Sequence, residues 1–214
     1  MRCWLVLAAL FVAGCAGGPP APDWQANAHA SLAAHTAAYL AGRDRVARQE
    51  LALARREVAR TANASLMARV ELTACAVRIA SLESTDCPAF EALEADADAA
   101  ARAYADYLTG RWEALDARLL PPAQQGVPGS RDALATLAAI DDPLSRLVAA
   151  AVLLRAGRLS PAGIERAIDT ASRQGWRRPL MAWLAFDRDR CRAAGDPACV
   201  EERQRRIDYL MGAR

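Results

Sequence analysis

Hydrophobic residues recur along this chain with the spacing of a helix rather than that of a strand. In residues 44–60, Ala47, Leu51, Ala54 and Val58 follow one another at helical intervals, so they form one stripe on a helix. Period-two alternation, which is typical of a half-buried strand, does not occur in the sequence. The pattern therefore predicts an all-α fold. A longer stripe of the same kind runs through residues 88–109: Phe90, Leu93, Ala97, Ala101, Tyr104 and Leu108.

Glycine and proline divide the pattern into separate predicted helices. Glycine readily adopts the left-handed backbone that ends many helices, and Gly42, Gly110, Gly157 and Gly195 stand at such ends. The pairs Asp142-Pro143, Ser160-Pro161 and Asp196-Pro197 join a capping side chain to a first-turn proline, so they predict helix starts. The predicted helices cover residues 23–41, 44–60, 64–82, 88–109, 111–119, 131–140, 143–156, 161–174, 179–193 and 197–211.

Two of the predicted helices carry segments that are apolar on nearly every side. Residues 147–154 read LVAAAVLL, and residues 180–186 read LMAWLAF. A helix of this kind must be covered by neighbours on more than one side. We therefore expect antiparallel helix pairs that stack on one another, with these two segments inside.

Short sequence repeats support this picture of stacked helix pairs. The segment AAYLAGR at 37–43 returns as ADYLTGR at 105–111, and segments 153–168 and 190–207 are related by a shift of 38. Helix pairs with this period resemble tetratricopeptide (TPR) or Sel1-type repeats, over roughly 23–82 and 131–211. The fuller TPR consensus is absent, and the distance from Gly110 to Gly157 lies outside a regular repeat. A short TPR-like array and an irregular helical bundle therefore both stay open.

The segment LLPPAQQGVPGS at 119–130 is the main interior loop signal. It predicts an N-terminal helical lobe at 23–120, a Pro/Gly loop at 121–130 and a C-terminal lobe of helical hairpins at 131–214.

Residues 1–14 have the plan of an export signal. Met1-Arg2 precedes about a dozen uncharged residues, which are too few to span a bilayer but suit the apolar core of a signal peptide. The segment leads into Val12-Ala13-Gly14-Cys15, which resembles the lipobox of bacterial lipoproteins. The resemblance implies cleavage before Cys15 and acylation of its sulfur. An ordinary secretory signal, cleaved nearby, is the alternative.

The residues after the lipobox suggest where the chain is held. Residues 15–22 are a Gly- and Pro-rich tether that reaches at most about 25–30 Å. By resemblance to sorted lipoproteins, Ala16 rather than Asp after the cysteine favours the outer membrane. Several acyl chains anchor a protein firmly, because each buried methylene contributes about 0.8 kcal/mol. We therefore expect a protein anchored by lipid at the periplasmic face of the outer membrane.

The remaining cysteines predict two disulfides. Cys3 leaves with the signal and Cys15 carries lipid, and an exported protein meets an oxidising compartment. Four cysteines allow three pairings, of which we favour the local one because each pair flanks a predicted helix restart. A zinc site is the alternative, but no Cys-x-x-Cys occurs and both histidines are distant in sequence, so we expect no metal and no cofactor. The expected pairs are Cys75–Cys87 and Cys191–Cys199.

Charge points to protein and membrane partners rather than to nucleic acid. The chain balances 27 basic residues, all arginine, against 25 acidic ones. One helix face in 44–60 is basic, and it either contacts an anionic surface or is simply solvated. Trp176, Arg177 and Arg178 at a helix corner are the best candidate contact point, because Trp and Arg are favoured at protein interfaces. The basic face consists of Arg45, Arg48, Arg55, Arg56 and Arg60.

The segment 83–116 is acidic, and on a continuous helix Glu91, Glu94 and Asp98 would share one face. A carboxylate pair there could perform acid–base chemistry, but no nucleophile or base accompanies it. His29 and His35 are six residues apart, which does not suit a helical metal pair. We therefore expect a non-enzymatic adaptor or assembly factor that binds an envelope protein. A cell-wall enzyme and a purely structural lipoprotein are the alternatives.

Overall fold

The computed structural model describes residues 22–83 and 86–212, and every regular element in these ranges is a helix. The predicted signal peptide and Cys15 lie outside the described residues. Within these residues, no helix has the length and hydropathy that crossing a membrane requires. The α-helices are α1 (Asp23–Leu40), α2 (Asp44–Ala59), α3 (Ala64–Ala80), α4 (Pro88–Glu91), α5 (Ala99–Thr109), α6 (Ala133–Ala139), α7 (Pro143–Arg155), α8 (Pro161–Arg173), α9 (Arg177–Ala193) and α10 (Pro197–Gly212); the 3₁₀ turns are η1 (Glu94–Asp96), η2 (Ala117–Leu119) and η3 (Pro122–Gln124).

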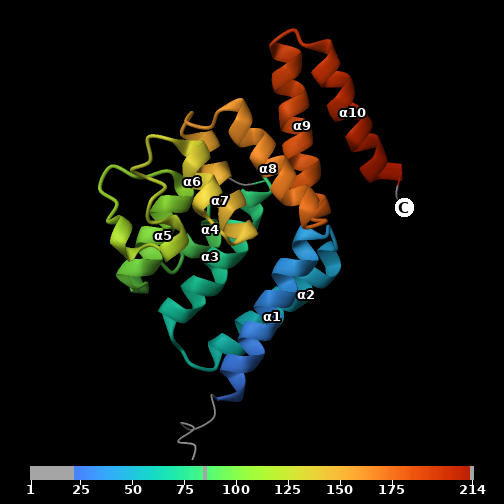
Figure 1. The fold of residues 1–214 in the computed structure, drawn as a ribbon. Coiled ribbons are helices and arrows are strands. Elements are labelled where there is room, and N and C mark those ends of the chain that lie inside the picture. Colours follow the sequence, from blue (N-terminus) through green and yellow to red (C-terminus); the bar gives the residue numbers. More distant parts are fainter. Residues whose placement is uncertain (1–21, 84–85, 213–214) are drawn as a thin grey trace, which may run out of the picture.

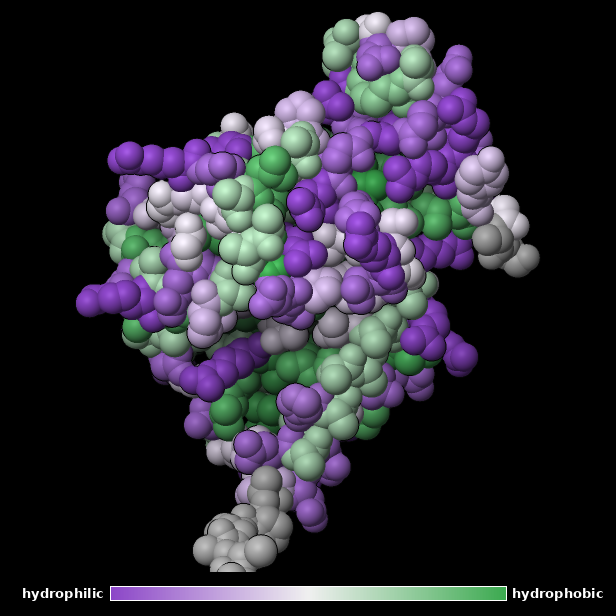
Figure 2. Space-filling view, in the orientation of Figure 1, coloured by the Kyte–Doolittle hydropathy of each residue, from purple (hydrophilic) through white to green (hydrophobic). Residues whose placement is uncertain are grey.

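The all-α prediction is confirmed, and the helices form three groups (Figure 1). Helices α1 and α2 make an antiparallel hairpin, α3 to α8 form the main body, and α9 with α10 makes a second hairpin that extends away from the body (Figure 1). Figure 2 shows hydrophobic side chains in a hollow between α1 and α3, whereas the α9–α10 hairpin is largely hydrophilic.

Helix α7 lies at the centre of the main core. All residues from Leu147 to Leu153 are buried, because α3, α5, α6 and α8 pack around this helix. The expectation of an inner helix is confirmed there. On α9, Trp183 and Leu184 are buried but Phe186 is exposed, because this hairpin projects from the body.

The main core crosses the loop at 121–130. Helix α3 packs against α7, so residues before and after the loop share one cluster. The loop itself is packed, since Val127 and Gln124 are buried and η3 forms at its start. A smaller cluster joins α1, α2 and α3.

The predicted helix at 88–109 is wrong as a continuous element. Helix α4 ends at Glu91, and α5 begins only after Asp98, whose side chain accepts a hydrogen bond from the Ala101 N–H and caps the new helix. Glu91 and Asp98 therefore lie on different elements rather than on one helical face. Four residues of the predicted stripe are buried in spite of the break, namely Phe90, Ala97, Ala101 and Leu108.

The predicted helix at 111–119 is also wrong, apart from the turn η2 at its end. Gly110 has a φ of 83° and ends α5. Trp112 then turns back, and its indole N–H donates to the Tyr107 carbonyl at 2.9 Å. Packing of this tryptophan takes precedence over local helix propensity.

The two copies of the repeated heptapeptide share a local shape but not an environment. Gly42 and Gly110 both end a helix with positive φ. Tyr39 in the first copy is partly exposed and is followed by α2, whereas Tyr107 in the second is fully buried and is followed by a loop. The similarity therefore marks a common helix ending and not a repeated hairpin at these two places.

Candidate functional site

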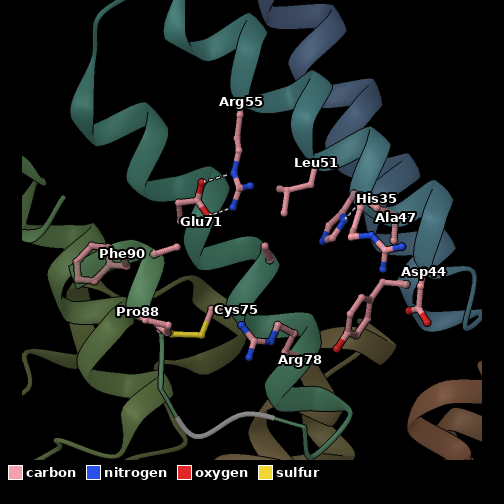
Figure 3. Close-up of a pocket in the computed structure, with 15 residues that line it drawn as sticks. His35, Asp44, Ala47, Leu51, Arg55, Glu71, Cys75, Arg78, Pro88 and Phe90 are labelled. Carbon is pink, nitrogen blue, oxygen red and sulfur yellow. Dashed lines mark hydrogen bonds and ion pairs between the residues drawn. A yellow bond between two sulfur atoms is a disulfide. The ribbon is translucent and has the colours of Figure 1, made fainter. Parts of the chain in front are cut away.

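A cleft of about 230 Å³ lies between the α1–α2 hairpin and α3 with α4 (Figure 3). Its apolar surface comes from Leu51 of α2, Ala74 of α3 and Phe90 of α4, together with a disulfide. Seven titratable side chains also line it, among them Tyr39 and Asp44, and they come from three different helices. The other five are His35, Arg48, Arg55, Glu71 and Arg78.

The disulfide between Cys75 and Cys87 builds one wall of this cleft. Cys75 lies in α3, and Cys87 immediately precedes α4, which starts with a proline in its first turn. The covalent bond holds the short α4 against α3, where Phe90 is buried. A four-residue helix has little stability of its own, so this bond and the Phe90 contact position it.

An ion pair closes one end of the cleft. The Arg55 Nε–H and Nη2–H donate to the two carboxylate oxygens of Glu71, each at 2.6 Å (Figure 3). The Glu71 side chain is only 7% exposed, whereas that of Arg55 is 44% exposed. The hydrogen bond to Glu71 raises the pKa of Arg55 further above its ordinary value. The two charges thus neutralise each other within the fold.

Two further arginines in the cleft carry positive charge without a matching carboxylate. Arg48 of α2 and Arg78 of α3 line it, and neither has a hydrogen-bond or ion-pair partner among the residues described in the structure. Asp44 also lines the cleft, but it already pairs with Arg178 from α9. The cleft therefore has a net positive charge above an apolar floor.

His35 supplies a polar atom with no partner. Its side chain is 4% exposed, and its Nδ1 lies 2.8 Å from the carbonyl oxygen of Ala47. Because that oxygen can only accept, Nδ1 carries the proton and Nε2 of the neutral ring is an acceptor. No group among the described residues donates to Nε2. Figure 3 shows the ring directed into the cleft.

Burial explains the protonation state of this histidine. Desolvation lowers the pKa of His35, and the nearby Arg55 adds to this effect, while the Ala47 hydrogen bond and Glu71 oppose it. The ring is therefore neutral at pH 7. The other histidine of the chain, His29, is exposed on the same helix and lies outside the cleft.

The predicted contact point at Trp176, Arg177 and Arg178 has mainly an internal role. Arg178 donates to the Tyr39 carbonyl at 2.8 Å and pairs with Glu83 at 2.7 Å and with Asp44, and its guanidinium lies 4.3 Å from the centre of the Tyr39 ring. Its side chain is 17% exposed. Trp176 packs against the main core, so of the three residues only Arg177 is left without such a tie.

The predicted basic face of α2 divides into two parts. Arg48 and Arg55 point to the cleft, where Arg55 pairs with Glu71. Arg45 and Arg56 are exposed and do not line the cleft, and Arg60 pairs with Glu57 on the same helix.

Three of the acids in 83–116 pair with arginines rather than with one another, and no group of three carboxylates within 4.8 Å lies in the described part of this segment. Asp98 caps α5 and pairs with Arg69, Asp106 pairs with Arg111, and Asp116 caps η2 and pairs with Arg118. Hydrogen bonds, first of all from the Ala101 N–H, lower the pKa of Asp98. A general acid needs the opposite shift, so these caps and ion pairs serve the fold.

The second disulfide lies at the end of the α9–α10 hairpin. Cys191 is in the last turn of α9, Cys199 is in the first turn of α10, and their sulfurs are bonded. Together with Asp187 they form a group with the donor types of a metal site. However, Asp187 accepts from Arg190 at 2.6 Å and from Arg203 at 2.7 Å, and disulfide sulfurs lack the thiolate that metals prefer. The group is therefore a structural one.

When compared with protein-family models, with curated proteins and with solved structures, the chain matches none of them. The residues of the cleft therefore have to be interpreted from their own geometry.

Sequence reasoning selected Arg48 and Arg55 but missed three residues of this cleft. Glu71 and Arg78 lie in a predicted helix without any distinctive motif, and the sequence offers His35 only as half of an unsuitable metal pair with His29. A glutamate within the apolar run of 64–82 is the one sequence sign of a buried ion pair.

Proposed function

We propose that this protein is an adaptor or assembly-factor lipoprotein, anchored by Cys15 at the periplasmic face of the outer membrane, which binds a segment of another envelope protein. The lipobox and the short tether support the anchoring. The two disulfides support an oxidising compartment, because such bonds persist mainly in exported proteins.

The observation that carries the binding role is the cleft between α1, α2 and α3. It combines an apolar floor with two arginines, Arg48 and Arg78, that have no carboxylate partner in the part of the chain that the structure describes, and polar groups placed in this way are typical of recognition sites. Glu71 is paired with Arg55 and Asp44 with Arg178, so neither carboxylate that lines the cleft is a free general acid. Binding is thus better supported than catalysis.

The helical hairpins support the same role. A TPR-like array presents its helices to a partner along one side, and α1–α2 and α9–α10 are hairpins flanking a common body (Figure 1). The degenerate repeats in this chain would then act as a scaffold that holds the cleft in place.

The experiment is crosslinking in intact cells followed by mass spectrometry. The adaptor role predicts that one envelope protein is recovered reproducibly with the wild-type chain. Recovery of no envelope protein would contradict the role.

The anchoring has its own test. The Cys15→Ser variant should appear in the soluble periplasmic fraction, whereas wild type should sediment with membranes. If the variant still sediments, the lipid is not what holds this protein. Peptide mapping without reduction should recover Cys75–Cys87 and Cys191–Cys199 in both forms, and a crossed pairing would contradict the hairpin geometry.

A further inference from the structure

We propose that the cleft between α1, α2 and α3 binds a carboxylate attached directly to an apolar group, as at the free carboxyl end of a peptide that terminates in an apolar residue. This inference rests on the proposed function only in taking the cleft as the place where the partner engages. It names the chemistry that the cleft recognises, which the adaptor role by itself does not.

The charge balance of the cleft calls for an anion. Among the charged residues that line it, Arg55 and Glu71 neutralise each other, and Asp44 is paired with Arg178. Arg48 and Arg78 are left with no partner among the described residues. Arginine presents paired N–H donors that match the two oxygens of a carboxylate, so a ligand carboxylate would complete this arrangement.

The surface of the cleft calls for an apolar group beside that anion. Leu51, Ala74 and Phe90 line it together with the disulfide, and Figure 3 shows Arg78 reaching in beside Cys75. A fully hydrated anion would leave this apolar surface in contact with water. A side chain such as that of leucine or valine would cover it and gain about 25 cal/mol for each Å² of apolar surface removed from water.

The size of the cleft limits how much of a ligand it can hold. A volume of about 230 Å³ is below the range of about 300–1,000 Å³ that is usual for drug-sized ligands. One residue or a small acid can enter, whereas a long peptide cannot lie in it. A chain end fits this limit better than an internal segment, because there a single residue carries both an apolar side chain and a carboxylate.

The unpartnered nitrogen of His35 adds a third element. His35 is only 4% exposed, and its Nε2 is an acceptor. The ring is directed into the cleft (Figure 3). A terminal residue carries an amide N–H next to its carboxylate. An N–H donor on the ligand is therefore the natural partner for Nε2, since a buried acceptor without a donor costs free energy.

The probe for the test is a fluorescein-labelled peptide that ends in leucine with a free carboxylate. The protein is the full-length lipidated chain in a non-ionic detergent. Binding is followed by fluorescence polarisation of the peptide. We expect saturable binding, and at least about tenfold weaker binding of the same peptide with an amidated end. Equal binding of the amidated peptide, or no saturable binding of the free acid, would overturn the inference.

Variants locate the binding in the cleft. Arg78→Gln should weaken binding of the peptide by about tenfold, while Arg56→Gln, on an exposed part of α2 outside the cleft, should leave it unchanged. Because the Arg78 side chain has no hydrogen-bond or ion-pair partner among residues 22–83 and 86–212, its replacement should not change the melting temperature. Equal effects of the two substitutions would place the binding elsewhere.

Small competitors separate the two sources of this chemistry. If N-acetylleucine and the peptide both bind and compete for one site, the ligand is a chain end. If N-acetylleucine binds and the peptide does not, the chain-end inference is overturned in favour of a free small acid. Acetate and inorganic phosphate should compete far less than N-acetylleucine, and equal competition would overturn the role of the apolar group.

Crosslinking with Arg78→Gln separates this inference from the adaptor role. A partner recovered equally with wild type and variant would leave the adaptor role in place and overturn the carboxylate inference. If the peptide binds in vitro but no partner is recovered in cells, the carboxylate inference stands and the adaptor role is overturned.

Discussion

Replacement of Arg55 tests whether the end of the cleft is held by a buried charge. In the Arg55→Ala variant, the carboxylate of Glu71 would lose both of its hydrogen bonds, each 2.6 Å long, while remaining in a side chain that is 7% exposed. Replacing Arg56 in the same way removes an arginine with no ion-pair partner in the described part of the chain. The two variants thus compare the loss of a buried interaction with the loss of an exposed arginine on the same helix.

The expected loss in the free energy of unfolding is large for an arginine that faces the surface. Removing one partner of a buried ion pair costs about 3–5 kcal/mol. Since the Arg55 side chain is 44% exposed, water reaches its end of the pair and we expect about 2–3 kcal/mol for Arg55→Ala. For a chain of this length that corresponds to a melting temperature lower by roughly 4–12 °C. Arg56→Ala should stay within about 0.5 kcal/mol of wild type.

Guanidinium unfolding followed by circular dichroism measures these free energies, and a double variant identifies their origin. Arg55→Ala combined with Glu71→Met replaces the stranded carboxylate by an apolar side chain of similar length. The double variant should be more stable than Arg55→Ala alone, because no buried charge remains. If the double variant is equally or less stable, or if Arg55→Ala costs no more than Arg56→Ala, the reasoning about this ion pair is refuted.

Three other predictions follow from the fold. Because burial lowers the pKa of His35, folding stability should be intact above pH 6.5 and fall as pH decreases below it; His35→Phe should flatten this dependence of the melting temperature, and His29→Phe should not. Trp183→Ala should lower the free energy of unfolding by about 3–5 kcal/mol in denaturant titration, because Trp183 is fully buried and its indole N–H donates to α3; a loss below 1 kcal/mol would contradict this packing. Arg178→Ala should cost about 1–2 kcal/mol in the same titration and Arg177→Ala much less, because only Arg178 ties α9 to Tyr39; equal costs would show that this tie contributes nothing.

Helix ends were predictable where a capping residue and a first-turn proline set them. Asp142 and Ser160 each accept a hydrogen bond from an N–H in the first turn of the helix that follows, and a proline occupies that turn. The break between α4 and α5 was missed although Asp98 is also a capping residue. The hydrophobic stripe continued across the break, and a continuous stripe is compatible with both one helix and two short ones.

The cleft was predictable only in part. The apolar stripe of α2 showed which side of the helix faces inward, and therefore which arginines face outward. It could not show that Arg55 and Arg48 stand at the edge where α3 arrives, nor that Arg78 and His35 meet them there. Those neighbours are brought together by the angle between the hairpin and α3, which no periodicity within one helix encodes.

The sequence by itself determined the helical class, most helix boundaries and the buried character of α7, because spacing, capping and glycine conformation act within a few residues. It also suggested the cysteine pairs, since each links one helix to the start of the next. Only the tertiary structure decided that Arg178 is an internal tie, that the acids of 83–116 are dispersed, and that a positively charged cleft exists. Each of these depends on contacts between helices far apart in the chain, where packing and charge pairing across the core outweigh any local preference.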